Sequence, residues 1–198
     1  GVERVGVVGA RFGAMVAALV AERARLPLMA LWQPFVSGAE FLLDSLQTAI
    51  LAQRLDQAEQ GGGNGGLQED LRNMGWSDVN GWLLTQKAWQ EISAIDLIAD
   101  LKGFRGSALT VGVSLTGSPP KDPAAIAAHL RSQGASCAEY GVEDQGALVF
   151  GQRQFQKLPD RQGEKDALYE VSTKIADITT RWAIDQLTED HATSETNA

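Results

Sequence analysis

The turn at Gly9–Gly13, with the sequence Gly-Ala-Arg-Phe-Gly, has the residue types and spacing in this chain that best suit chemistry. It lies between a valine-rich segment at 2–8 and an apolar helical pattern. Backbone N–H groups at a helix N-terminus attract anions, and the guanidinium of Arg11 would strengthen that attraction. We expect either a site for a carboxylate, phosphate or acidic partner residue, or an Arg11 that pairs inside the protein. The expected binding residues are Ala10, Arg11, Phe12 and Trp32.

The glycines of this turn do not complete a nucleotide-binding pattern. The dinucleotide fingerprint G-x-G-x-x-G would need glycine at Arg11 and Ala14. Gln33 stands where a nicotinamide enzyme needs a charged residue to bind the ribose. We therefore expect no nucleotide and no other cofactor.

Other reactive residue types are few. The chain has one cysteine, Cys137, and two histidines, His129 and His191. A lone cysteine within a predicted strand is typical of an inert core thiol, and no cysteine and histidine spacing matches a metal site. Asp122 precedes Pro123, which predicts a helix N-cap, and a catalytic acid is the alternative role for this carboxylate.

Composition limits the function classes. The chain has 198 residues, 44% of them hydrophobic, and a formal net charge of −8. That length suits one globular domain, and the negative charge provides no basic surface for nucleic acid. The sequence has no signal-peptide pattern and no apolar run of the roughly 18 residues that a membrane span requires. We expect a cytoplasmic protein that binds neither nucleic acid nor membrane.

The elements that would position these residues follow an α/β pattern. Strand periodicity predicts a small, mostly parallel sheet of about four strands, at 2–8, 28–32, 107–114 and 136–142. Helices are predicted to begin near Phe12, Asp122 and Glu164 in the core and near Ser37 in the middle of the chain. The buried face of the first helix is expected to consist of Phe12, Met15, Val16, Leu19 and Val20.

The middle of the chain, at 37–106, predicts a helical, cap-like insertion between two parts of an α/β core at 1–36 and 107–187. Helical patterns at 67–74 and 82–101 follow a loop at 61–66 whose six residues, GGGNGG, are typical of a flexible connection. The tryptophans of this insertion either pack in its core or line a hydrophobic groove: Trp76, Trp82 and Trp89. The polar residues 188–198 are expected to form a disordered tail.

The turn at Gly9–Gly13 resembles the nucleophile elbow of the α/β-hydrolase fold, in which small residues flank a strained turn between a strand and a helix. Within that superfamily the chain is similar to the serine-aminopeptidase-like and exosortase-associated hydrolase-like branch. The segments at 31–38 and 79–84 resemble the strand that opens the cap and part of the cap itself. The resemblance covers the second half of the family's fold, because the strands before the elbow have no counterpart.

The resemblance implies a site whose chemistry does not carry over. Arg11 occupies the position of the nucleophilic serine, and its guanidinium cannot attack a carbonyl. The family's acid would correspond to Asp122 or its neighbourhood, and its histidine to the region 141–150, which contains none.

We therefore expect a catalytically degenerate, hydrolase-like binding or structural subunit. Its partner would be another protein or a second copy that completes the sheet at the unpaired edge of the first strand. The alternatives are an esterase or acyl-transfer enzyme with a nucleophile outside the elbow, and a binder of anions or small acyl ligands.

Overall fold

The computed structural model describes residues 4–47, 67–79, 82–143 and 173–188. The chain divides into two compact units, one formed by 1–36, 97–147 and 160–198 and the other by 37–96 and 148–159. Four predicted features lie outside the described residues: the glycine-rich loop at 61–66, the start of the last helix near Glu164, the tail from residue 189 onward, and His191.

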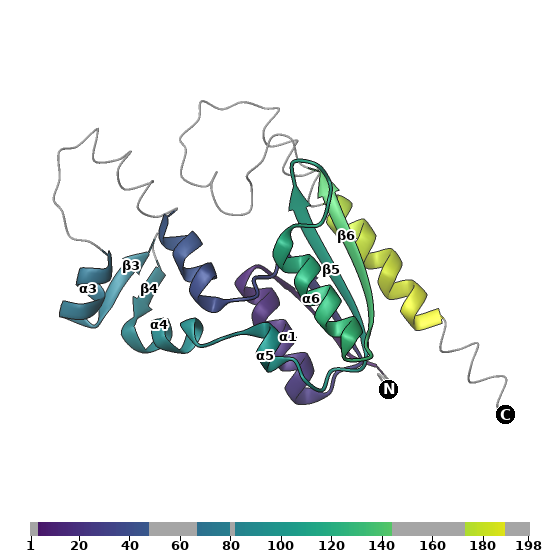
Figure 1. Ribbon diagram of the computed structural model, residues 1–198, viewed down its shortest axis with the longest axis horizontal. Coiled ribbons are helices and arrows are strands. Elements are labelled where there is room, and N and C mark those ends of the chain that lie inside the picture. The colour runs from purple at the N-terminus through teal and green to yellow at the C-terminus, as the bar shows by residue number, and fades with distance from the viewer. Residues whose placement is uncertain (1–3, 48–66, 80–81, 144–172, 189–198) are drawn as a thin grey trace. The chain divides into compact units, whose positions relative to one another are not determined.

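The first unit is built on a four-stranded parallel sheet in the order β1-β2-β5-β6 (Figure 1). The strands are β1 (Gly6–Ala10), β2 (Leu28–Trp32), β5 (Ser107–Ser114) and β6 (Ser136–Glu143). The central strands β2 and β5 are largely buried, as expected of parallel strands covered on both faces. The predicted α/β class and the mostly parallel sheet of about four strands are confirmed. The carboxyl ends of these strands share one edge of the sheet, where open α/β sheets place their ligands.

The first strand is the element of this sheet that differs most from its prediction. It begins at Gly6 and continues through Ala10, whereas the sequence pattern indicated a buried strand at 2–8. In the described part of the chain β1 pairs only with β2, so it forms an edge of the sheet. The side chains of Val5 and Val8 are 55% and 58% exposed. Valine suits an edge strand as well as a buried one, so its β propensity could not distinguish the two.

Helices flank the sheet. They are α1 (Phe12–Ala24), α5 (Leu97–Asp100), α6 (Lys121–Ser132) and a helix at 173–188. Helix α5 contacts both α1 and α6, and Figure 1 shows α6 and the helix at 173–188 (yellow) on opposite faces of the sheet. The last helix includes Thr188, one residue beyond its predicted end.

The buried face of α1 is not the one that its larger apolar residues predict. The helix buries Met15 and four alanines: Ala14, Ala17, Ala18 and Ala21. Val16 and Val20, which were expected in the core, are 42% and 43% exposed. At about 100° per residue these valines lie on the other side of the helix. Small side chains allow α1 to approach the strands closely, so close packing selects the alanine face over the more hydrophobic one.

The second unit contains helices and a β-hairpin that the sequence analysis missed. Its elements are a helix at 38–47, α3 (Leu67–Met74), β3 (Trp76–Val79), β4 (Trp82–Thr85) and α4 (Gln86–Ser93). The predicted helix at 82–101 is therefore wrong at its start, where β4 pairs antiparallel with β3. The two strands are separated by Asn80 and Gly81, and Asn-Gly between β-prone residues is a strong hairpin signal that the helical assignment overlooked.

Residues 97–106, which we assigned to the insertion, lie instead with the first unit. The Leu97 N–H donates to the carbonyl of Val36 at 2.9 Å, and Leu97, Leu101 and Phe104 are buried. The carboxylate of Glu22 in α1 accepts hydrogen bonds from the N–H groups of residues 102 and 103. These bonds tie the segment to the sheet and its helices, and no composition change along the sequence marks the boundary.

Candidate functional site

The turn between β1 and α1 has the strained geometry that its sequence suggested. Arg11 has φ 53° and ψ −118°, and a positive φ is uncommon for a residue other than glycine. Its N–H donates to the carbonyl of Trp32 at 2.8 Å, and its carbonyl accepts from Ala14 at 3.0 Å. A Cβ on Gly9 would overlap the Gly13 carbonyl, so the turn requires glycine at its first position. At Gly13 itself the space around a Cβ is open.

The side chain of Arg11 interacts with the segment that follows β2. Its guanidinium carbon lies 5.2 Å from the centre of the Phe35 ring, within cation–π range. Arg11 and Phe35 are both half-buried. A protonated guanidinium held over a ring cannot act as a nucleophile, so the residue at the elbow supplies a fixed positive charge and no attacking group.

Gln33, one residue beyond β2, bonds to the backbone of β5 at the carboxyl end of the sheet. Its amide oxygen accepts from the N–H of Val113 at 2.7 Å, and its amide nitrogen donates to the carbonyl of the same residue at 3.3 Å. The backbone N–H of Gln33 also donates to Val111 at 2.7 Å. The side chain thus continues the β2–β5 ladder past the end of the strand. In the sequence, Gln33 stands out only as an uncharged residue where a ribose ligand would be, and no local pattern predicts this pairing.

Asp122 does not cap its helix, contrary to the prediction. The N-cap of α6 is Pro120, without a side-chain cap, and Asp122 lies in the first turn. Its carboxylate accepts a hydrogen bond from the N–H of Val36 at 3.1 Å. Proline is tolerated within the first turn of a helix as well as directly after a cap. Pro123 therefore allows Lys121 and Asp122 to belong to the helix. The candidate acid thus holds the segment after β2.

The remaining predicted binding residues are divided between the turn and the sheet. Ala10 is exposed at the end of β1, and Phe12 is half-buried at the start of α1. The indole Nε1 of Trp32 donates to the Thr179 hydroxyl at 2.9 Å, which links β2 to the helix at 173–188. The Thr179 hydroxyl in turn donates to the carbonyl of Ile175 at 2.8 Å. Trp32 therefore approaches the turn through its backbone carbonyl, while its side chain anchors a helix.

The histidine that a hydrolytic triad requires is not at this edge in the described part of the chain. His129 lies within α6, and its Nε2 is 2.7 Å from the carbonyl oxygen of Leu101. That contact belongs to the packing of the segment after α5. The region 141–150 contains no histidine in the sequence.

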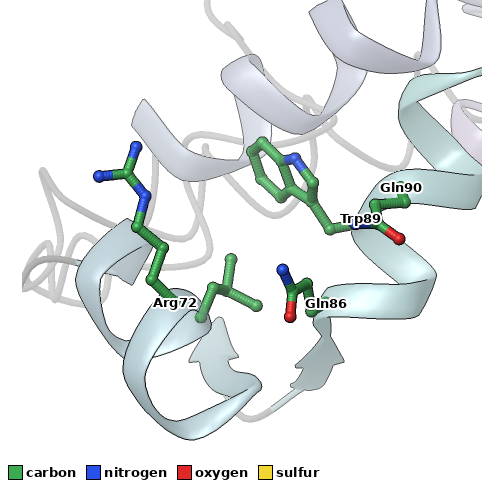
Figure 2. Close-up of a pocket in the computed structure, with 5 residues that line it drawn as sticks. Arg72, Gln86, Trp89 and Gln90 are labelled. Carbon is green, nitrogen blue, oxygen red and sulfur yellow. The ribbon is translucent and has the colours of Figure 1, made fainter.

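The second unit contains a pocket of about 330 Å³ between α3 and α4. Figure 2 shows Arg72 extending from α3 on one side and Trp89 from α4 on the other, with Gln86 and Gln90 on α4 as well. Leu71 also lines the pocket. One of the three insertion tryptophans therefore lines a groove, as one of the two sequence alternatives proposed.

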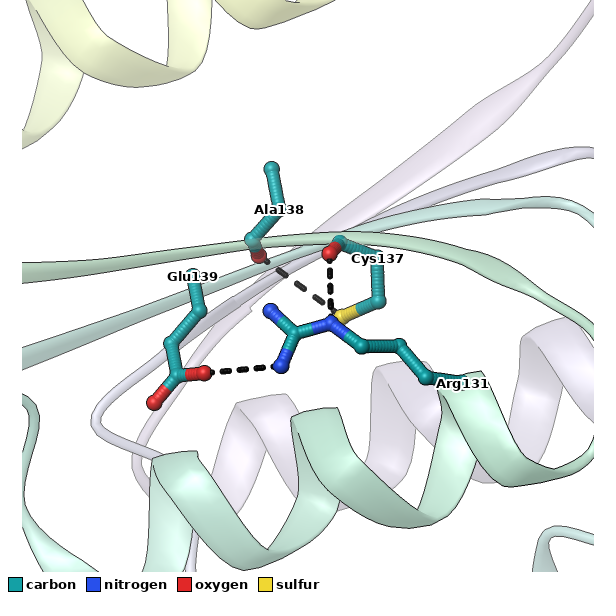
Figure 3. A network of polar contacts seen from close by, with 4 residues as sticks. All are labelled: Arg131, Cys137, Ala138 and Glu139. Atoms are coloured by element: carbon teal, nitrogen blue, oxygen red, sulfur yellow. Dashed lines mark hydrogen bonds and ion pairs between the residues drawn. The ribbon is translucent and has the colours of Figure 1, made fainter.

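Cys137 is held in an environment that suppresses its reactivity. Burial raises the pKa of its thiol to about 11, partly offset by the nearby Arg131 guanidinium. Arg131 donates to the Cys137 carbonyl and to the Glu139 carboxylate, both at 3.0 Å (Figure 3). The thiol is protonated at neutral pH, so Cys137 offers no nucleophile.

Neither a metal site nor a membrane-spanning helix is found among the described residues. They contain no group of three or more His, Cys, Asp or Glu side chains arranged to hold a metal ion. Within the same residues, no helix combines the length and the apolar character needed to cross a membrane.

Comparisons with known proteins give partial matches to solved structures at low identity. No family model matches the chain, and no curated protein matches it. Among solved structures, it is similar to the esterase Est1E of Butyrivibrio proteoclasticus, solved with ferulic acid, at 16% identity and a TM-score of 0.45. That match covers 72% of this chain and 51% of the esterase.

Two further solved structures show the same kind of partial similarity. The non-heme bromoperoxidase BpoC of Mycobacterium tuberculosis is 12% identical with a TM-score of 0.41, over 86% of this chain and 67% of that protein. Esterases of the fungus Rhizomucor miehei give 16% identity and a TM-score of 0.38, over 92% of this chain and 53% of theirs. In each of these three matches the chain spans only part of the other protein's length, about half in the case of Est1E.

Proposed function

We propose that this chain is a non-hydrolytic protein with a hydrolase-like fold, and that it acts as a structural or binding subunit through the free edge of β1. The fold itself does not determine the activity, because one fold supports many unrelated functions. The proposal therefore rests on the residues of the turn and on the edge strand β1.

The turn argues against hydrolysis. Arg11 occupies the elbow, and its guanidinium lies over Phe35. Asp122, the candidate acid, accepts the N–H of Val36. A triad requires a nucleophile hydrogen-bonded to a base that is oriented by an acid. Among the described residues at the carboxyl ends of the strands, no nucleophile is paired with a base in this way.

The observation that carries the binding role is the composition and exposure of β1. The sequence Gly-Val-Val-Gly-Ala contains no charge and no proline, which are the residues that usually protect a sheet edge. The chain carries a net charge of −8, yet nothing in β1 would repel another copy of β1. We propose that two copies pair their β1 strands around a two-fold axis, so that both sheets continue into one.

The direction of the backbone groups makes this pairing testable. The N–H of Arg11 points to β2, and N–H groups alternate along a strand, so the N–H of Val8 points to the free edge. A Val8→Pro variant removes that donor without breaking the β1–β2 ladder, since an edge strand accepts proline at such a position. Leu115→Asn, which removes exposed apolar surface away from the edge, is the matched control.

Light scattering after size exclusion should give the mass of two chains for the parent and for Leu115→Asn, and of one chain for Val8→Pro. A monomeric parent would contradict pairing between copies. Independently, a chromogenic short acyl ester should not be hydrolysed above background, and a fluorophosphonate probe should label no serine.

A second candidate function is anion binding at the turn. It is favoured by a cation, Arg11, placed at the N-terminus of α1. Weaker binding of inorganic phosphate by Arg11→Ala than by the parent would support it, and equal binding would exclude it.

A further inference from the structure

We propose that the pocket between α3 and α4 binds a small carboxylate with a flat apolar body, such as an aromatic acid. The described residues that line this pocket all belong to the second unit, and they are Leu71, Arg72, Gln86, Trp89 and Gln90. The proposal is independent of the function assigned to the first unit, because no residue of the turn or of β1 takes part in it.

The apolar part of the pocket suits a flat group. Leu71 is buried and Trp89 is half-buried, so both present apolar surface to the cavity. An indole offers a broad face on which another planar ring can stack. The volume of about 330 Å³ lies at the small end of the range found for ligand pockets, roughly 300–1,000 Å³. A single-ring ligand therefore matches the pocket in size.

The polar part of the pocket suits an anion. Among the described residues that line it, the charged one is Arg72 and none is a carboxylate. Within the described part of the chain, the side chains of Arg72, Gln86 and Gln90 make no hydrogen bond or ion pair with the protein. The planar guanidinium fork matches the two oxygens of a carboxylate, and the amide N–H groups add further donors.

The nearest charged pair on α4 does not compete for this ligand. Lys87 and Glu91 lie one helical turn apart, with their charged atoms 3.7 Å from each other, and neither lines the pocket. Lys87 is therefore a suitable position for a control substitution, since it removes a positive charge from the same helix without changing the lining.

The test is a ¹⁹F NMR titration of the full chain labelled with 5-fluorotryptophan. The chain has five tryptophans, and the Trp89 resonance is identified by its loss in Trp89→Phe. Benzoate should shift the Trp89 resonance in a saturable manner. Benzamide, which keeps the ring and lacks the charge, should bind at least tenfold more weakly, and so should cyclohexanecarboxylate, which keeps the charge and lacks the flat ring.

Arg72→Gln should weaken benzoate binding at least tenfold, whereas Lys87→Gln should leave it unchanged. The comparison of the three ligands on the parent protein tests the proposal even where a variant does not fold. Absence of a saturable Trp89 shift, or equal affinities for benzoate and benzamide, would overturn the proposal. An Arg72→Gln variant that folds and binds benzoate as the parent does would overturn it as well.

Discussion

Individual side chains at the carboxyl edge of the sheet interact with other parts of the protein, at a place where catalytic or ligand-binding residues would be expected. Gln33 bonds both backbone groups of Val113, and Asp122 bonds the N–H of Val36. Arg11 lies over Phe35. In open α/β sheets, polar groups at this edge normally face a ligand. Here they bond to the protein itself and hold the chain segment that follows β2.

Replacing Gln33 should cost stability. In Gln33→Ala, the N–H and carbonyl of Val113 lose their partners in a half-buried place, which should lower the free energy of unfolding by about 1–3 kcal/mol. Gln33→Glu should also destabilise, because a carboxylate cannot donate to the carbonyl of Val113. Urea unfolding monitored by circular dichroism measures both. Lys121→Ala, at an exposed position of α6, is the control and should change stability little. Equal stability of Gln33→Ala and the parent would show that the side-chain clamp contributes nothing.

The thiol of Cys137 should make stability depend on pH in the alkaline range. The folded-state pKa of about 11 is above the ordinary value of 9.0, so folding favours the protonated form. This contribution is complete below pH 9 and is lost as the pH rises from 9 to 11. Relative to Cys137→Ala, the parent should therefore lose unfolding free energy over that range. Alkylation of the folded chain by iodoacetamide at pH 7 should be slow, and rapid alkylation would contradict the raised pKa.

Among the elements, the connection from β1 to α1 depends on close backbone approach. A Cβ at Gly9 would overlap backbone atoms of Gly13 and Ala14, which cannot move away as a flexible side chain can. Gly13 has open space in the same direction and lies in the first turn of α1. The two glycines of the elbow-like motif therefore have unequal roles, which their symmetrical spacing in the sequence conceals.

This inequality predicts opposite effects for two equivalent substitutions. Gly9→Ala should destabilise the chain by about 1–3 kcal/mol, because the strained turn must open to admit the methyl group. Gly13→Ala should be neutral or stabilising by up to about 1 kcal/mol, because alanine is the better helix former. Thermal unfolding of the two variants beside the parent tests this. The reverse order of stability would refute the geometry of the turn.

At the scale of the whole molecule, hydrolysis would require groups from three distant parts of the chain to meet at the edge of the sheet. Restoring one of them is therefore not enough. Arg11→Ser should give a folded protein that hydrolyses a chromogenic acyl ester no faster than the parent, because no histidine occurs at 141–150. Turnover that is lost again on treatment with a fluorophosphonate would show that a base is present, and would favour the esterase alternative.

The sequence by itself determined three of the four strands of the first unit. Alternating or continuous apolar runs, broken by glycine and proline, predicted β2 and β5 at their observed bounds and β6 to within one residue. The glycine-flanked turn predicted the strained conformation at Arg11, because local backbone sterics act over a few residues. The absence of a nucleophile at position 11 was also readable from residue identity alone.

Only the tertiary structure decided which faces are covered and which polar groups pair. Packing chose the alanine face of α1 over the valine face, placed residues 97–106 with the sheet, and left β1 at an edge. Pairing assigned Asp122 to Val36 and Gln33 to Val113, across separations of 86 and 80 residues. Such contacts depend on how distant segments meet in space, and the local periodicity of a sequence carries no record of that.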